Sequence, residues 1–356
     1  MMGTYLVCGG AGYIGSHMCK RLYEAGHRVV VCDDLSTGHA GALLWGIHAC
    51  GSIEDTDFLR ALFSQYRFDG VLHFAALSSV AESMRSPQRY YRHNVAATLN
   101  LLRVMHEFEV RRFVFSSTAA VFGEPQARLI AEDHPTVPLN PYGLSKLMVE
   151  QILRDSCRVD GLRAVALRYF NAAGADPAAR IGEAHDPETH LIPKLVRRAL
   201  GEDIDVVING TDYPTADGTC VRDFVHVDDL AQAHLLALDH LDHAVGMHCF
   251  NLGNGTGHSV KQVVDAVGEV TGQRLNVATS GRRAGDPSHL VAASKRARSV
   301  LGWEPRFTRI SDVIETAVRW HRSEAYATWL AGAGDGDVTQ QRLPGNDETF
   351  KQHRRG

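Results

Sequence analysis

Three glycines that follow the first apolar run constrain the fold of this chain more than any other feature. Gly9, Gly12 and Gly15 separate a β-rich run at residues 5–8 from an amphipathic stretch at residues 14–25. Glycine allows a tight turn and close backbone approach, and the start of a helix offers free N–H donors to an anion. Because the glycines lie between a predicted strand and a predicted helix, they predict a turn that holds the pyrophosphate of a dinucleotide.

Short β-rich runs alternate with amphipathic stretches of helix length through the first half of the chain. This alternation is typical of parallel β-α-β units, whose right-handed crossovers place helices on both faces of a sheet. We therefore predict an α/β fold with a Rossmann-like, doubly wound parallel sheet that binds its ligands at the carboxyl ends of the strands. The predicted strands are residues 5–8, 28–32, 46–50, 70–74, 112–116 and 163–168, and the predicted helices are residues 14–25, 56–66, 88–106 and 142–159.

Two aspartates at the end of the second predicted strand indicate which dinucleotide binds. Asp33 and Asp34 come roughly 20 residues after the turn, where an acidic side chain accepts hydrogen bonds from the adenosine ribose. A carboxylate there repels a ribose phosphate, so the sequence favours NAD over NADP. The alternative is that both aspartates only begin a solvated turn with residues 36–38.

The amino-acid composition changes after residue 170, where Gly, Pro, Asp and His become frequent. We predict that residues 1–170 form the NAD-binding domain and that residues 220–252 return to it. A smaller α/β lobe for the substrate is predicted from residues 171–219 and 253–330. Residues 331–356 lack periodicity, and we expect them to be a disordered tail.

Composition and charge exclude several classes of partner. The 356 residues are 44% apolar and 22% charged, and the net charge is −4, so no basic field exists to attract nucleic acid or an anionic membrane. No apolar run reaches the length of a spanning helix, and the first residues do not resemble a secretory leader. The 7 cysteines include no C-x-x-C pair. We therefore expect a cytoplasmic protein with reduced thiols.

The many histidines raise the question of a metal. The sequence has 19 of them but no His-Glu-x-x-His motif. The pairs His185/His190 and His240/His243 appear without thiols or carboxylates in a matching arrangement, so we expect no metal site.

A tyrosine and a lysine begin the predicted helix at residues 142–159. Tyr142 and Lys146 are four residues apart, which places both side chains on one face. A phenol with a pKa of about 10 is a poor base unless positive charge stabilises the phenolate, and an ammonium group and an oxidised nicotinamide would both do so. Ser116, Ser117 and Thr118 supply hydroxyls at the end of the fifth strand. Such a pair alone is common on helix surfaces, but together with the glycine turn it predicts hydroxyl oxidation.

Further motifs complete the pattern: His-Phe-Ala-Ala at 73–76, Pro-Tyr-Gly-Leu-Ser-Lys at 141–146, Asp-Tyr-Pro-Thr at 212–215, Val-Arg-Asp at 221–223 and Arg-Arg-Ala-Gly-Asp at 282–286. With them, residues 4 to about 325 resemble the extended short-chain dehydrogenase/reductase family, and specifically the UDP-glucose 4-epimerases. The resemblance implies an NAD-dependent isomerase of galactose metabolism that interconverts UDP-glucose and UDP-galactose through a 4-keto intermediate. It also implies a homodimer formed by the helices at residues 88–106 and 142–159.

The same resemblance assigns roles to residues. Tyr142 would be the catalytic base, Lys146 would lower its pKa and anchor the nicotinamide ribose, and Thr118 would bind the reacting oxygen. The implied cofactor contacts are Gly9, Gly12, Tyr13, Ile14, Gly15, Asp33, Ser52, Ile53, Phe74, Ala75, Ala76, Asn94, Ser116, Tyr142, Lys146 and Tyr169. The implied substrate contacts are Thr118, Tyr142, Asn171, His190, Leu191, Arg222, Arg283 and Asp286. From the residues alone, Arg222 and Asp223 would equally suit a surface ion pair.

Several alternatives stay open at this point. Related dehydratases carry acidic residues directly after the threonine, whereas residues 119–121 here are Ala-Ala-Val, which favours simple epimerisation. Ser52 stands where the family usually has aspartate. Leu290 lies near the position whose bulk decides whether an N-acetyl group fits. The substrate could therefore be a UDP-N-acetylhexosamine, UDP-uronic acid or UDP-pentose instead. A non-catalytic NAD sensor is the third reading, and the intact Tyr142, Lys146 and Thr118 argue against it.

Overall fold

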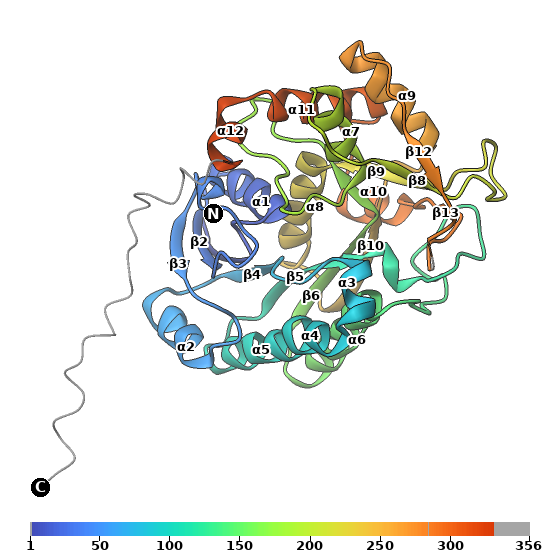
Figure 1. The fold of residues 1–356 in the computed structure, drawn as a ribbon. Helices are drawn as coiled ribbons and strands as arrows, with labels where there is room; N and C mark the ends of the chain where they lie inside the picture. Colours follow the sequence, from blue (N-terminus) through green and yellow to red (C-terminus); the bar gives the residue numbers. More distant parts are fainter. Residues whose placement is uncertain (1, 284, 331–356) are drawn as a thin grey trace, which may run out of the picture.

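A computed structural model describes residues 2–283 and 285–330. Its centre is a seven-stranded sheet in the order β10-β6-β5-β4-β1-β2-β3, in which every neighbouring pair is parallel (Figure 1). The strands are β1 (Thr4–Cys8), β2 (Arg28–Asp33), β3 (Ile47–Cys50), β4 (Gly70–His73), β5 (Arg112–Thr118), β6 (Arg163–Tyr169) and β10 (Gly246–Leu252). The chain builds outward from β1 to β3 and then crosses back to add β4. This order confirms the predicted doubly wound fold and places the ligand crevice between β1 and β4.

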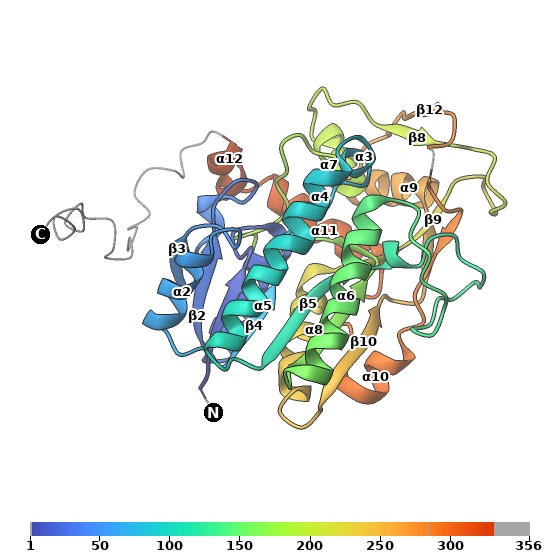
Figure 2. The ribbon, with the colours of Figure 1, turned by 90° about the horizontal axis from the view of Figure 1, so that it is seen from below.

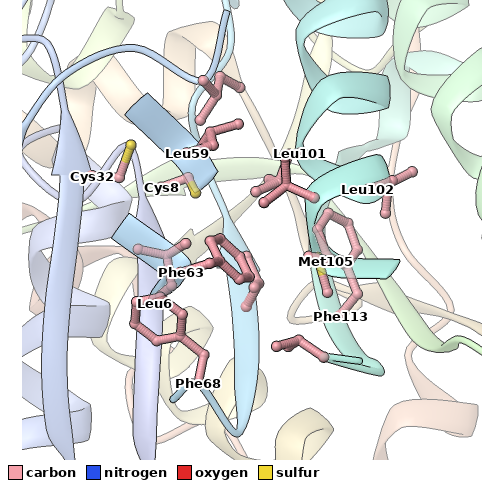
Figure 3. Close-up of a cluster of buried hydrophobic side chains, with 14 of the residues drawn as sticks. Leu6, Cys8, Cys32, Leu59, Phe63, Phe68, Leu101, Leu102, Met105 and Phe113 are labelled. Carbon is pink, nitrogen blue, oxygen red and sulfur yellow. The ribbon is translucent and has the colours of Figure 1, made fainter. Parts of the chain in front are cut away.

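Helices cover both faces of the main sheet. One face carries α2 (Thr56–Gln65), α5 (Ala97–Glu107) and α6 (Pro141–Val159), and the other carries α1 (Tyr13–Glu24), α8 (Val227–His240) and α10 (Lys295–Leu301). In β1, Leu6 and Cys8 pack in the core under α2 and α5, as Figure 3 shows, whereas Tyr5 and Val7 pack under α1 and α8. Side chains alternate along a strand, so a strand buried on both faces is apolar throughout, which is the pattern of residues 5–8.

The helix predicted at residues 88–106 is present but interrupted. It consists of α4 (Pro87–Tyr90), a π-helical turn η2 (Tyr91–Ala96) and α5. A π-helical turn inserts one extra residue and often marks a functional position. A short helix that the sequence analysis did not include, α3 (Val80–Arg85), precedes it, and the Ser79 hydroxyl caps this helix by accepting a hydrogen bond from Glu82 N at 3.2 Å.

A smaller lobe adjoins the carboxyl edge of the main sheet, because β7 follows β6 directly. Its sheet has the order β11-β9-β13 with β7 paired to β9, and a separate pair joins β12 to β8. The strands are β7 (Asn171–Ala173), β8 (Val207–Asn209), β9 (Val221–His226), β11 (Gly257–Ser259), β12 (Ala278–Ser280) and β13 (His289–Leu290). The helices are α7 (Leu191–Ala199), α9 (Val260–Thr271), α11 (Ile310–His321) and α12 (Glu324–Leu330), with 3-10 turns η1 (Ala40–Ala42) and η3 (Ala119–Val121) in the first domain.

Residues 220–252, which we predicted to return to the first domain, divide between the two sheets. Helix α8 and strand β10 do return, and Figure 2 shows β10 at the edge of the main sheet. Strand β9 instead pairs with β7, β11 and β13. Helix α10, predicted to belong to the lobe, packs on the main sheet through Ala297 and Leu301. The predicted disordered tail lies outside the described residues.

No helix in residues 2–283 or 285–330 combines the length and apolarity needed to cross a bilayer.

A buried ion pair fixes the helix that carries Tyr142 and Lys146. Both carboxylate oxygens of Glu150 on α6 accept from Arg168 on β6, with Nε at 2.9 Å and Nη2 at 2.6 Å. The Ser117 hydroxyl at the end of β5 donates to the same carboxylate at 2.6 Å. The side chains of Glu150 and Arg168 are 0% and 2% exposed. This two-pronged pairing sets the register of α6 against β5 and β6.

We expect Glu150→Gln to lower the free energy of unfolding by about 3–5 kcal/mol, because it leaves the Arg168 guanidinium buried without a counter-charge. Urea denaturation measures the loss. The matched control is Arg154→Gln, which removes the exposed partner 3.7 Å from Glu150 and costs less than about 1 kcal/mol. Equal losses for the two variants would contradict the importance of the buried pair.

Candidate active site

The glycine turn packs so closely that two of its glycines cannot be replaced. Gly9 has φ +81°, and a Cβ on it would lie 2.5 Å from Ala75 N in the segment after β4. A Cβ on Gly15 would lie 2.1 Å from Gly9 O. These two glycines are therefore explained by the packing of β1, α1 and β4 against one another.

Gly12, the third glycine of the turn, is not explained by packing in the same way. A Cβ on Gly12 would meet nothing within 4 Å except Gly9 O at 3.3 Å, so packing alone does not demand glycine there. Gly12 is the N-cap of α1 and provides no side-chain cap, and the first N–H with an intrahelical partner is that of Ser16, which donates to Gly12 O at 3.0 Å. The N–H groups of Tyr13, Ile14 and Gly15 thus point out of the helix end. This open, donor-rich end fits a pyrophosphate group.

Asp33 lies at the end of β2, beside the turn. Its Oδ2 accepts from Ala11 N and its Oδ1 from Leu35 N, each at 2.9 Å, and burial raises the pKa of its carboxyl. Asp34 closes a local turn, accepting from Ser36 N at 3.0 Å, and hydrogen bonds with Ser36 and Ser52 help to lower the pKa of its carboxyl. Carboxylate oxygens have lone pairs for further bonds, so Asp33 can hold the turn and still accept from a ribose hydroxyl.

Other predicted cofactor residues lie at the same carboxyl edge of the main sheet, and some of their side chains form contacts within the protein. The Tyr13 phenol donates to Gly174 O at 2.6 Å, so its backbone rather than its ring faces the pyrophosphate position. The Ile53 side chain belongs to the core under α2. Ser52, Phe74, Ala75 and Ala76 lie in the segments that follow β3 and β4.

Asn94, in the π-helical turn, is fully engaged by the protein. Its Oδ1 accepts from Leu77 N at 2.9 Å, and its Nδ2 donates to Leu77 O and to the Ser145 hydroxyl, both at 3.0 Å. The Ser145 hydroxyl in turn donates to Tyr142 O at 2.7 Å. The side chain therefore ties the segment after β4 to the first turn of α6.

Tyr142, Lys146 and Thr118 gather at the carboxyl end of β5. Thr118 is the last residue of β5, and Tyr142 and Lys146 lie on the first turns of α6, which begins after Asn140 caps Gly143 N at 2.9 Å. Burial raises the pKa of the Tyr142 phenol, and a hydrogen bond with the Thr118 hydroxyl lowers it. The predicted trio is thus brought together by the fold.

Lys146 is almost completely buried. Its Nζ donates to Ser116 O at 2.9 Å and lies 4.8 Å from the centre of the Phe115 ring. Burial lowers its pKa to about 7. Burial thus weakens the positive charge that Lys146 can offer to Tyr142, and the positive charge of an oxidised nicotinamide would favour the phenolate as well.

Ser116 and Tyr169 face each other across β5 and β6. The Tyr169 hydroxyl and Ser116 Oγ share a hydrogen bond, and burial raises the pKa of the phenol. Both were predicted as cofactor contacts, and the Ser116 carbonyl oxygen also accepts from Lys146.

The predicted substrate residues come from four segments of the lobe. Asn171 begins β7, Leu191 begins α7 directly after His190, and Arg283 is exposed in the loop before β13. Arg222 on β9 donates to Val221 O and Pro287 O, each at 2.9 Å, and lies 3.5 Å from Asp286.

Asp223 does not form the surface ion pair with Arg222 that the sequence allowed. It is buried and accepts from the backbone N–H groups of Asn254 at 2.8 Å, Gly255 at 3.0 Å and Ala292 at 3.1 Å. Its neighbours on the strand point the opposite way, so the two charges separate.

His185 and His190 do have carboxylates in a matching arrangement, so our prediction that they lack them is wrong. Glu183 and Glu188 lie beside them, and the four ligand atoms are all within 4.8 Å of one another. Glu183 and His190 share a close ion pair, which raises the pKa of His190 to about 9. The sequence did carry a signal that we did not use, since Glu-x-His occurs twice, at 183–185 and 188–190.

Glu150 was not among the predicted site residues. It lies four residues after Lys146 and eight after Tyr142, so helical periodicity places all three on one side of α6. A carboxylate on that buried side requires a cation, and Arg168 supplies it.

The fold and this edge define a class of protein: a dinucleotide-binding α/β protein with a tyrosine, a lysine and a threonine at its ligand crevice. The model of the NAD dependent epimerase/dehydratase family matches residues 5–253, and the chain belongs to this family. The predicted resemblance and the choice of NAD as cofactor are thereby confirmed at the level of the family.

Three relatives are similar along almost their whole length. The UDP-glucose 4-epimerase of Halalkalibacterium halodurans is 48% identical over 321 residues, which cover 90% of this chain and 96% of that protein. A crystal structure of the Brucella ovis UDP-glucose 4-epimerase in complex with NAD is 44% identical, with a TM-score of 0.85 and coverage of 89% of this chain and 97% of that chain. The Bifidobacterium longum UDP-glucose 4-epimerase in complex with NAD+ and UDP is 36% identical, with a TM-score of 0.86 and coverage of 91% and 99%.

We expect Lys146→Met to stabilise the NAD-free protein although it removes a site residue. The buried lysine has a pKa of about 7 against 10.5 in its ordinary state, so below pH 7 folding carries the full cost of burying its charge. As pH rises from 7 toward 10.5 the folded protein keeps a neutral amine, and this cost disappears.

Thermal unfolding of both proteins across this range tests the expectation. The stability advantage of the variant should be largest at pH 6 and shrink by pH 9, by the linkage relation. An advantage that grows with pH would show that Lys146 is not the buried neutral amine described.

Proposed function

We propose that this protein is an NAD-dependent UDP-hexose 4-epimerase that interconverts UDP-glucose and UDP-galactose. The observation that carries the proposal is the meeting of Tyr142, Lys146 and Thr118 beside a glycine turn that fits a pyrophosphate. The names of the relatives that span almost the whole chain support it.

NAD would lie along the edge from the glycine turn to α6. The N–H groups of Tyr13, Ile14 and Gly15 would hold the pyrophosphate, Asp33 the adenosine ribose, and Lys146 the nicotinamide ribose. Bound there, NAD would take a hydride from carbon 4 of the sugar and later return one to the same carbon, on its other face.

Tyr142 would act as the base. Its phenolate oxygen would take the proton from the 4-hydroxyl and give it back at the end of the cycle, while the Thr118 hydroxyl donates to the same oxygen. A 4-keto sugar is the intermediate of this exchange. Residues 119–121 form the turn η3 and supply only Ala, Ala and Val, so this turn offers no acid or base for the proton transfers of a dehydratase.

The lobe would bind the nucleotide half of the substrate. We propose Arg222 and Arg283 for the diphosphate, Asp286 for the uridine ribose, and Asn171, His190 and Leu191 for the remaining contacts. Because Arg222 already meets two carbonyl oxygens and Asp286, it is held in place before any substrate arrives.

We propose that the size of the side chain at Leu290 limits which sugar the site accepts. This side chain packs in a small apolar cluster with Phe122 and Phe170.

We expect purified protein to convert UDP-galactose into UDP-glucose when the products are separated by chromatography. Conversion of a UDP-N-acetylhexosamine, UDP-uronic acid or UDP-pentose alone would favour the alternative substrates, and no conversion of any UDP-sugar would leave an NAD sensor.

The variant Tyr142→Phe sharpens this assay. We expect it to keep bound NAD but to lose roughly 10²–10⁴-fold in turnover, because the base is gone while the cleft is unchanged. Tyr23→Phe, on the exposed side of α1, is the matched control and should keep full activity. Unchanged turnover in Tyr142→Phe would refute the assignment of the base.

We also propose a homodimer formed through α5 and α6. Leu99 on α5 and Met148 on α6 are exposed apolar side chains. A pocket lined by both apolar and charged residues, among them Leu99, Leu102 and Arg103 of α5 and Ser156 of α6, lies beside the two helices. Light scattering should give the mass of two chains. The double variant Leu99→Asp/Met148→Asp should give one, and a monomeric wild type would contradict the proposal.

A cytoplasmic location completes the proposal. All 7 cysteines are free, and Cys8, Cys19, Cys32 and Cys220 are buried, which suits a reducing compartment.

A further inference from the structure

Four side chains with metal-binding atoms converge in the loop before α7. They are Glu183, His185, Glu188 and His190, and each offers one atom within 4.8 Å of all the others. This is the one such group in the described part of the chain.

The spacing of the atoms is close to that of a tetrahedral site. His185 Nδ1 lies 3.1 Å from Glu183 Oε1 and 3.9 Å from Glu188 Oε2. His190 Nδ1 is in direct contact with Glu183 and lies 3.8 Å from Glu188 Oε1, the carboxylate oxygen that also accepts from two backbone N–H groups. Ligands about 2.0–2.1 Å from a zinc ion at tetrahedral angles are roughly 3.3 Å apart. Binding therefore requires Glu183 and His190 to separate and the wider pairs, which lie within 4.8 Å, to close.

Two features of the cluster indicate that it could bind a cation. The Nδ1 of His185 is buried and has no hydrogen-bond partner, although a carboxylate oxygen is 3.1 Å away. The side chains of Glu183 and Glu188 are 4% and 1% exposed, and two adjacent buried carboxylates are costly unless positive charge neutralises them. His185 and His190 balance the two carboxylates only if both rings are protonated, whereas a dication balances them with both rings neutral.

The loop is held rigidly around this point. Trp320 Nε1 donates to Glu183 O at 2.8 Å, and the His39 ring contacts Ala184 O. The N–H groups of Thr189 and His190 donate to Glu188 Oε1 at 2.7 and 2.8 Å. These bonds orient the Glu188 carboxylate and leave its Oε2 free, as outer bonds around metal ligands commonly do.

We propose that Glu183, His185, Glu188 and His190 bind one zinc ion. Two imidazole nitrogens and two carboxylate oxygens suit Zn²⁺, whereas Mg²⁺ and Ca²⁺ take six or more oxygen ligands. Four protein ligands fill the tetrahedron, so the ion has a structural role and fastens the loop to the start of α7. The site replaces our expectation that the chain binds no metal, and it does not rest on the proposed function.

The purified full-length protein, with the cofactor it retains, provides the test. After dialysis against a chelator, titration with Zn²⁺ followed by calorimetry should give about one ion per chain with a Kd below about 1 µM. Zn²⁺ should also raise the melting temperature. Elemental analysis of the undialysed protein gives an independent stoichiometry.

Variants locate the ion. His185→Gln, and independently Glu188→Gln, should weaken binding by at least about 10–100-fold. His243→Gln, an exposed histidine outside the cluster, is the matched control and should bind as wild type does. Wild-type protein without saturable binding at micromolar Zn²⁺, or undiminished binding by His185→Gln, would overturn the proposal even if Glu188→Gln failed to fold.

Discussion

The buried pair of Glu150 and Arg168 is the interaction on which the geometry of the site depends. Helix α6 carries both Tyr142 and Lys146 and packs on the sheet through Val149 and Leu153, and the buried pair adds a directional constraint to this apolar contact. The two parallel hydrogen bonds between carboxylate and guanidinium, with the Ser117 hydroxyl as a third, supply this constraint. They hold the first turns of α6 over the end of β5, where Thr118 lies.

The glycine turn and the lysine illustrate two ways in which the protein is prepared for a ligand. Gly9 and Gly15 are explained by contacts inside the protein, but Gly12 leaves open space at a helix end rich in donors. Lys146 is buried with a lowered pKa and a single carbonyl partner, which is unfavourable for folding alone. Both features make physical sense only with a bound dinucleotide, and such local conflicts with stability are typical of functional sites.

Much of the fold and the central trio could be predicted from the sequence, because short continuous apolar runs, helical periodicity and glycine turns are local signals. The strands of the main sheet and the helix of Tyr142 followed from them directly. The partner of β9 could not be predicted, since residues 221–226 alternate weakly and a strand does not encode which sheet it joins. The pairings of Glu150 with Arg168 and of Asp223 with backbone N–H groups join residues far apart in sequence, so single-sequence periodicity does not reveal them.

The amide of Asn94 links two parts of the crevice that would otherwise move separately. One end of its side chain holds Leu77 in the wall after β4, and the other reaches, through Ser145, the peptide of Tyr142. The hydrogen bonds that hold the segment after β4 against a bound cofactor are therefore continuous with those that hold the backbone of the proposed base. The segment after β4 and the first turn of α6 are therefore coupled through Asn94 and Ser145, and greater mobility of one segment would be transmitted to the other.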